Sequence, residues 1–273
     1  MLKDITLGQY FPGKSPLHKR DPRIKIIAAV IYIVTVFLCS SIASFGILMA
    51  ATLIFIIVSG VPLKIIVKGL KPLVFILAFT TIYNVFFHSG DTVLLDLKIV
   101  KIHLEGVIFA VVMVVRIVCL LIGSSIFLTY TTSPIMLTDG LERLLKPLKV
   151  IKLPVHEFAM MTSIALRFIP TLIEETDKIM SAQKARGADF STGSLIQRAK
   201  ALVPILIPLF VSAFRRAGEL AVAMECRCYR GESGRTRMKQ LHVSFGDIML
   251  VLLMCIFTAA VILINIYFPI FVI

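Results

Sequence analysis

Long apolar runs, separated by short polar or basic segments, dominate the pattern of the chain. These runs cover residues 24–40, 42–61, 73–88, 107–130 and 245–268. An α-helix needs about 17 to 25 mainly apolar residues to cross the hydrocarbon core of a bilayer. The pattern therefore predicts an all-α, polytopic membrane protein with about five transmembrane helices. The run 73–88 is the shortest, and Lys71 at its entry can extend its reach by keeping its ammonium group at the membrane surface.

Local signals predict where several elements begin. Asp21 followed by Pro22 is typical of an N-cap with proline at the first helical position. Pro134 and Pro154 indicate two further helix starts. Between residues 91 and 105 apolar and polar residues alternate, which favours an exposed β-like loop.

The segment 131–244 contains more than half of the 29 Lys and Arg residues and is predicted to be helical and cytoplasmic. Within it, the apolar run from Ala201 to Phe214 is too short to span a bilayer, and we expect Pro204 and Pro208 to break it. It is therefore interpreted as a buried or interfacial helix. The predicted organisation is a cytoplasmic N-terminal segment, four transmembrane helices, a set of cytoplasmic helices, and a fifth transmembrane helix with a tail, which cover residues 1–23, 24–130, 131–244 and 245–273.

Composition and charge support this location. The chain is 58% hydrophobic and only 16% charged, whereas soluble domains are about 25% charged. Its net charge of +13 arises from Lys and Arg residues between the apolar runs, where they meet anionic lipid headgroups. We therefore expect membrane lipid, and not nucleic acid, as a partner. The charge distribution predicts a multi-pass protein of the cytoplasmic membrane with its amino terminus inside and its carboxyl terminus outside.

Catalytic and metal-binding patterns do not stand out. The five His residues are scattered, and the spans are nearly free of Asp and Glu. Cys226 and Cys228 have C-x-C spacing, but no His or second Cys pair completes a zinc set. We expect no catalytic residues, no metal and no cofactor, and thus no enzymatic activity.

The residues from Gly8 to Ser15 match the P-loop pattern literally. A working P-loop connects a buried strand to a long helix in an α/β domain. Here Pro16 follows the match at once and the first membrane helix begins at Pro22. We therefore predict that the match arises by chance and that the chain does not bind ATP.

Three of the polar residues within predicted spans are candidates for a specific role. Arg116 is either a functional site or a structural arginine that pairs with loop groups or backbone carbonyls, and the second interpretation is favoured. Asn84 and Asn265 are interpreted as interhelical hydrogen-bonding residues.

Two short segments repeat one pattern, in which small residues flank a single arginine. They are Ala185-Arg186-Gly187 and Cys226-Arg227-Cys228. A proline lies upstream of each, so we expect each arginine to end a helix, with Gly187 in a left-handed cap. Small neighbours leave a guanidinium free to enter a groove and bind a carboxylate. The alternative is a pair of basic helix ends that favour the macrodipole and have no partner.

These segments, with three other stretches, resemble the transmembrane T-component of energy-coupling-factor (ECF) transporters. Gly8-Gln9-Tyr10 with the following residues to Arg23 is similar to the start of that family. Thr131 to Glu142 and Ser163 to Pro170 are similar to its cytoplasmic helices, and the arginine segments to its X-Arg-X motifs. The second segment departs from the commoner Ala-Arg-Gly at both flanks.

The resemblance implies a coupling subunit without enzymatic activity of its own. Two ABC-type ATPases would dock on residues 185–187 and 226–228, and a small membrane S-component would bind the vitamin or other micronutrient. A stand-alone secondary transporter is the alternative, and a polytopic membrane enzyme a weaker one. The first should show repeated halves with broken helices at the midplane, and the second should show acidic or His clusters at the bilayer face.

Overall fold

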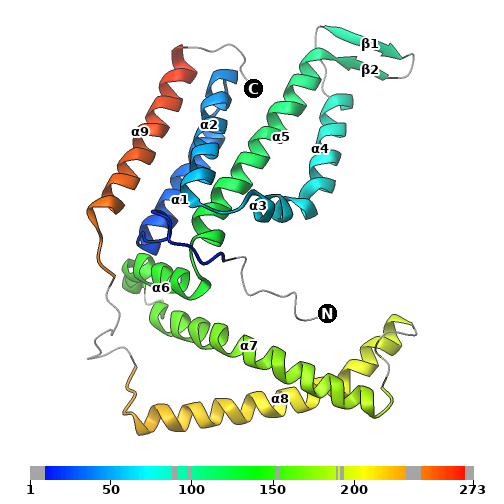
Figure 1. Cartoon of the computed structure of the whole chain (residues 1–273), viewed down its shortest axis with the longest axis vertical. Helices are drawn as coiled ribbons and strands as arrows, with labels where there is room; N and C mark the ends of the chain where they lie inside the picture. The colour runs from blue at the N-terminus through cyan, green and yellow to red at the C-terminus, as the bar shows by residue number, and fades with distance from the viewer. Residues whose placement is uncertain are drawn as a thin grey trace. The chain divides into compact units, whose positions relative to one another are not determined.

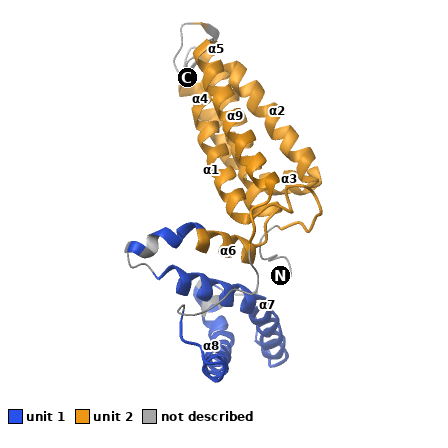
Figure 2. Ribbon diagram, turned by 90° about the vertical axis from the view of Figure 1, so that its left-hand side faces the viewer, with its two compact units in different colours: residues 1–7, 144–240 blue, residues 8–143, 241–273 orange. Residues whose placement is uncertain are grey.

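The computed structural model describes residues 10–87, 92–97, 100–151, 154–188, 190, 194–231 and 241–267, and α-helices make up most of this length. The chain divides into two compact units (Figure 2). Residues 8–143 and 241–273 form the bundle unit, and residues 1–7 and 144–240 form the long-helix unit.

The bundle unit consists of apolar helices that run along one another (Figure 1). They are α1 (Pro22–Leu38), α2 (Ile42–Ser59), α4 (Val74–Phe87), α5 (Leu104–Ser125) and α9 (Phe245–Tyr267). Helix α1 packs against α9 and α5, while α2 and α4 pack against α5. The all-α polytopic fold is confirmed.

Shorter elements complete this unit. Helix α3 (Leu63–Leu70) and a 3-10 turn (Lys71–Leu73) precede α4. Strands β1 (Val93–Leu97) and β2 (Val100–His103) form an antiparallel hairpin, which confirms the β-like loop. A π-helical turn (Ile126–Tyr130) extends α5, and α6 (Pro134–Leu145) begins at the predicted proline.

Among the residues that the structure describes, five helical segments are long and apolar enough to cross a membrane. They are Ile42–Ser59, Leu63–Phe87, Leu104–Tyr130, Lys200–Cys226 and Phe245–Tyr267. Four of them overlap predicted spans. The fifth lies in the segment predicted to be cytoplasmic, while α1, with 17 residues, is shorter than all five. Length and composition therefore support a membrane location, and the assignment of individual spans stays a prediction.

Aromatic residues fill the core of the bundle. The Tyr32 hydroxyl donates a hydrogen bond to the Cys119 carbonyl at 2.9 Å, and its ring packs against Phe55 and Phe127. A Cβ atom at Gly123 would collide with the Tyr32 ring, so glycine is required for this close approach of α1 and α5.

Polar groups tie the amino-terminal segment to the start of α1. Asp21 caps α1, forms an ion pair with Arg23 at 2.7 Å, and donates its N–H to the buried Asp247 carboxylate at 3.2 Å. The buried Lys25 ammonium donates to the carbonyls of Thr131 at 2.7 Å and His18 at 3.3 Å. The predicted Asp21-Pro22 helix start is confirmed.

The P-loop match adopts no P-loop architecture in its described part. Residues 10–14 have no regular structure, and a turn follows. The Ser15 hydroxyl pairs with His18 Nδ1 at 2.7 Å. Gly8 and Gln9 lie outside the described residues. Ser15 thus has a local structural role, as expected for a chance match, and the prediction that the chain does not bind ATP remains open to test.

The predictions for Arg116, Asn84 and Asn265 have different outcomes. Arg116 donates to the Cys39 carbonyl at 2.8 Å and lies over the Phe45 ring, which supports its structural interpretation. Asn265 bridges α9 to the α1–α2 turn by donating to the Leu38 carbonyl at 2.6 Å, so the interhelical prediction is confirmed. For Asn84 it is wrong, because the amide donates to Thr80 O within its own helix at 2.8 Å.

The long-helix unit contains a 3-10 segment (Lys146–Ile151), α7 (Val155–Ala185) and α8 (Leu195–Cys226). Pro154 precedes α7 as predicted. The expected break at Pro204 and Pro208 is wrong, because both lie inside α8, which has 32 residues. A proline removes one backbone hydrogen bond and bends a helix, but the helix can continue past it. Figure 1 shows α8 bent in its first half.

Candidate functional site

Two exposed arginines stand at the carboxyl ends of the long helices. Helix α7 ends at Ala185 and helix α8 at Cys226, and the next residues, Arg186 and Arg227, are their C-caps. We call residues 185–187 the first tip and residues 226–228 the second tip. All six tip residues are exposed. The prediction that each arginine ends a helix is confirmed.

Both tips end in the same hydrogen-bonded motif. In the first, the N–H groups of Gly187 and Ala188 donate to Lys184 O and Gln183 O, both at 3.0 Å. In the second, the corresponding donors are Cys228 and Tyr229, and the acceptors are Glu225 O at 2.8 Å and Met224 O at 3.0 Å. This pair of bonds is the Schellman motif, which satisfies carbonyls that the helix leaves free.

The residue after each arginine has left-handed backbone geometry. Gly187 has φ +89°, as predicted, and Cys228 has φ +55°. Among the described residues, Cys228 is the one residue other than glycine with positive φ. The departure from Ala-Arg-Gly in the second tip therefore does not change the helix-end geometry, although a side chain in this conformation costs about 1 to 2 kcal/mol.

Neither arginine side chain is used inside the described part of the chain. Neither guanidinium has a hydrogen bond or ion pair to a described residue. Each one therefore keeps its donor fork available for a planar carboxylate. The helix macrodipole also favours a cation at this end, so geometry alone is compatible with both interpretations of the tips.

The two tips lie at opposite ends of the helix pair, because α7 and α8 run in opposite directions across each other (Figure 1). Tyr229, directly after the second tip, donates from its hydroxyl to Met160 Sδ on α7 at 3.1 Å. This bond connects the second tip to the first half of the other helix. A displacement of one tip can thus be transmitted to the other tip through the packed helices α7 and α8.

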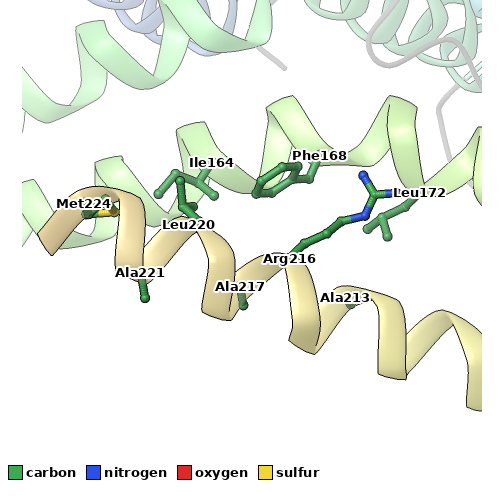
Figure 3. Close-up of a pocket in the computed structure, with 9 residues that line it drawn as sticks. All are labelled: Ile164, Phe168, Leu172, Ala213, Arg216, Ala217, Leu220, Ala221 and Met224. Carbon is green, nitrogen blue, oxygen red and sulfur yellow. The ribbon is translucent and has the colours of Figure 1, made fainter. Parts of the chain in front are cut away.

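An apolar groove of about 250 Å³ lies between the two helices (Figure 3). On each helix, residues at intervals of four positions line the groove. Those on α7 are large and apolar, and those on α8 include alanines. The lining residues are Ile164, Phe168 and Leu172 on α7, and Ala213, Arg216, Ala217, Leu220, Ala221 and Met224 on α8. The two stripes, at i, i+4 and i+8, were the signal in the sequence that could have predicted this groove.

One ion pair connects the helices beside the groove. Arg216 Nη2 donates to Glu175 Oε2 at 2.7 Å, and Figure 3 shows the Arg216 side chain extending toward Leu172. The nearby Ser212 hydroxyl and the Arg216 guanidinium lower the pKa of the Glu175 carboxyl. The pair is therefore ionised at neutral pH. Sequence reasoning missed it, because 41 residues separate its members.

Metal ligands do not gather in the described parts of the chain. No three His, Cys, Asp or Glu residues there lie close enough together to hold an ion. Cys226 and Cys228 are exposed free thiols.

The bundle of apolar helices defines a polytopic α-helical membrane protein. A family model described as cobalt transport protein matches residues 13–240. A protein of Ruminiclostridium cellulolyticum is 52% identical over 268 residues, which cover 98% of this chain and 100% of the relative. A relative from Clostridium kluyveri is 56% identical over 90% of this chain and 92% of its own length. A relative from Listeria innocua is 47% identical over 92% of this chain and 95% of its own length. All three are named energy-coupling factor transporter transmembrane protein EcfT. The chain belongs to this family of transporter membrane components.

Proposed function

We propose that this chain is the coupling subunit of an ECF-type importer. In this proposal, two ABC-type ATPases dock on the two tips, and a small membrane S-component binds the vitamin or other micronutrient. ATP is hydrolysed on the partner ATPases and not on this chain. The observation that carries the proposal is the equal geometry of the two tips, each with an exposed arginine at a Schellman helix end.

Equal tips suit two similar docking grooves. Arg186 and Arg227 each offer a guanidinium beyond a helix end that pairs with no described residue, with small residues on both sides. A carboxylate in the groove of each ATPase would accept two parallel N–H bonds from the guanidinium. Lys would replace Arg poorly, because an ammonium lacks the planar fork.

Motion would pass between the tips through the crossing of α7 and α8. When ATP closes the ATPase pair, the docked tips move, and the ion pair Glu175–Arg216 keeps the two helices acting as one body. The groove beside this ion pair is almost wholly apolar. Such a surface suits a membrane partner such as the S-component better than it suits water.

The location follows from the same proposal. The tips have to meet soluble ATPases, so residues 131–244 are cytoplasmic and the amino terminus lies on the same side. The Lys and Arg residues that lie before and at the start of α1, and those that precede α4, support this orientation.

Docking is tested with the whole complex, by co-purification of the ATPases and by vitamin uptake. Truncating one partner of a buried interfacial charge pair costs roughly 2 to 5 kcal/mol. With two tips acting together, each single Arg→Ala variant should keep some assembly, while the double variant Arg186→Glu, Arg227→Glu should lose both ATPases. Lys178→Glu, an exposed reversal elsewhere on α7, is the matched control and should assemble normally. If the double variant inserts, retains both ATPases and transports like the wild type, the tips are only solvated helix ends.

A further inference from the structure

Three lysines share one face of α3 and of the 3-10 turn that continues it. Lys64 and Lys68 are four residues apart and Lys71 follows three residues later, so the three side chains project to the same side. All three are exposed, and none pairs with a carboxylate of a described residue. On the opposite side Ile66, 3% exposed, packs into the core of the bundle. The bundle therefore holds α3 by one face and leaves a concentrated positive charge on the other.

Between these two faces lies an exposed apolar flank. Leu63 and Val67, one turn apart, are 64% and 63% exposed. On α4, which follows the 3-10 turn, Phe75 and Phe79 are also exposed. A water-soluble acidic partner would neutralise the lysines but would not match this apolar flank. A lipid monolayer supplies both an anionic headgroup layer and an apolar layer next to it.

The placement of α3 within its unit fits a membrane surface. Figure 1 shows α3 lying across the direction of α4 and α5, at the end of the bundle where α1 begins. Gly60, just before α3, lies close to Ser15 of the amino-terminal segment. An amphipathic helix across the end of a bundle has the orientation of an interfacial helix.

We propose that α3 is an interfacial helix that binds anionic phospholipid. Lys64, Lys68 and Lys71 contact the headgroup phosphates, while Leu63 and Val67 enter the adjacent acyl region. This surface lies in the bundle unit and does not depend on the function proposed for the tips.

The absence of tryptophan from the chain permits a direct test. Val67→Trp, at an exposed position, introduces a single tryptophan on the apolar flank of α3. The full-length variant is reconstituted into phosphatidylcholine vesicles that contain some phosphatidylglycerol, and bromine on the acyl chains of one lipid at a time quenches nearby tryptophan. Each lysine near an anionic surface contributes about fivefold to binding. We therefore expect brominated phosphatidylglycerol to quench at least about fivefold more per molecule than brominated phosphatidylcholine.

Two matched variants complete the test. Lys64→Gln, Lys68→Gln, Lys71→Gln in the Val67→Trp background should abolish the lipid preference while quenching itself persists. Phe87→Trp, exposed at the far end of α4 from these lysines, should show no preference. Equal quenching of Val67→Trp by the two lipids would overturn the proposal. Quenching by an aqueous agent but by neither lipid would also overturn it, because position 67 would then lie in water.

Discussion

Cys228 adopts the left-handed backbone conformation of the helix end, although its side chain disfavours that conformation. Its φ of +55° lies in the left-handed region, where glycine has no steric penalty. We predict that Cys228→Gly stabilises the protein by about 1 kcal/mol and retains ATPase docking, whereas Cys228→Val destabilises it and weakens docking. Thermal unfolding of the purified chain measures the first effect, and co-purification measures the second.

Cys226 is the matched control for this prediction, because it lies two residues earlier, as the last residue of α8. Cys226→Gly should destabilise the protein, since glycine is a poor helix former. The two glycine substitutions thus have opposite signs. Equal destabilisation by both would contradict the shared Schellman geometry of the tips.

At the scale of elements, the ion pair Glu175–Arg216 should matter more for coupling than for stability. Its members are partly exposed, with 21% and 34% of their side-chain surface accessible, so water screens their attraction. We predict that Arg216→Glu changes the unfolding temperature little but lowers the vitamin transported per ATP hydrolysed. The swap Glu175→Arg, Arg216→Glu should restore much of this ratio.

The pH dependence of this ion pair follows from the lowered pKa of Glu175. A carboxyl group whose pKa is lowered by folding stabilises the folded state at pH values above its ordinary pKa of 4.5. This contribution is lost as the pH falls below 4.5 and the carboxylate takes up a proton. The difference in unfolding temperature between Glu175→Gln and the wild type should therefore stay constant from about pH 6 to about pH 8. A change across that range would show that another group is involved.

Elements with local signals could be predicted from the sequence, and those that depend on distant contacts could not. Asp21-Pro22 marked the start of α1 because capping acts within one turn. The continuity of α8 through Pro204 and Pro208 could not be predicted, because the local signal of a proline favours a break and does not show that the helix resumes after the bend. Asn84 was misassigned for a similar reason. The side-chain amide of a helical residue can also donate to the backbone carbonyl four residues earlier in its own helix, as Asn84 does to Thr80 O.

The candidate site follows the same division. The tips were predictable, because small residues around an arginine at a helix end form a local pattern, and the left-handed Gly187 confirmed it. The left-handed Cys228 was not, since residues other than glycine rarely adopt this conformation. The stripes that line the groove are visible in the sequence, but their pairing required the register of α7 against α8, whose lining residues are far apart in the chain.

For the whole molecule, the question is whether Lys200–Cys226 of α8 crosses the membrane, as its length and composition would allow. We predict that it does not, so both ends of α8 face the cytoplasm. Ser194→Cys at one end and Cys226 at the other should each react with an impermeant thiol reagent only after cells are permeabilised. The background should lack the other cysteines. Labelling of the two ends from opposite sides would contradict this topology.

The central claim is that the two tips move when the docked ATPases bind ATP. Spin labels at Lys184→Cys and Glu225→Cys, exposed neighbours of the arginines, report the distance between the tips in the complete complex. Double electron–electron resonance should give one distance distribution without nucleotide and a shifted one with a non-hydrolysable ATP analogue. The shift should vanish in the Arg186→Glu, Arg227→Glu background. An unchanged distribution in a transport-competent complex would contradict the account.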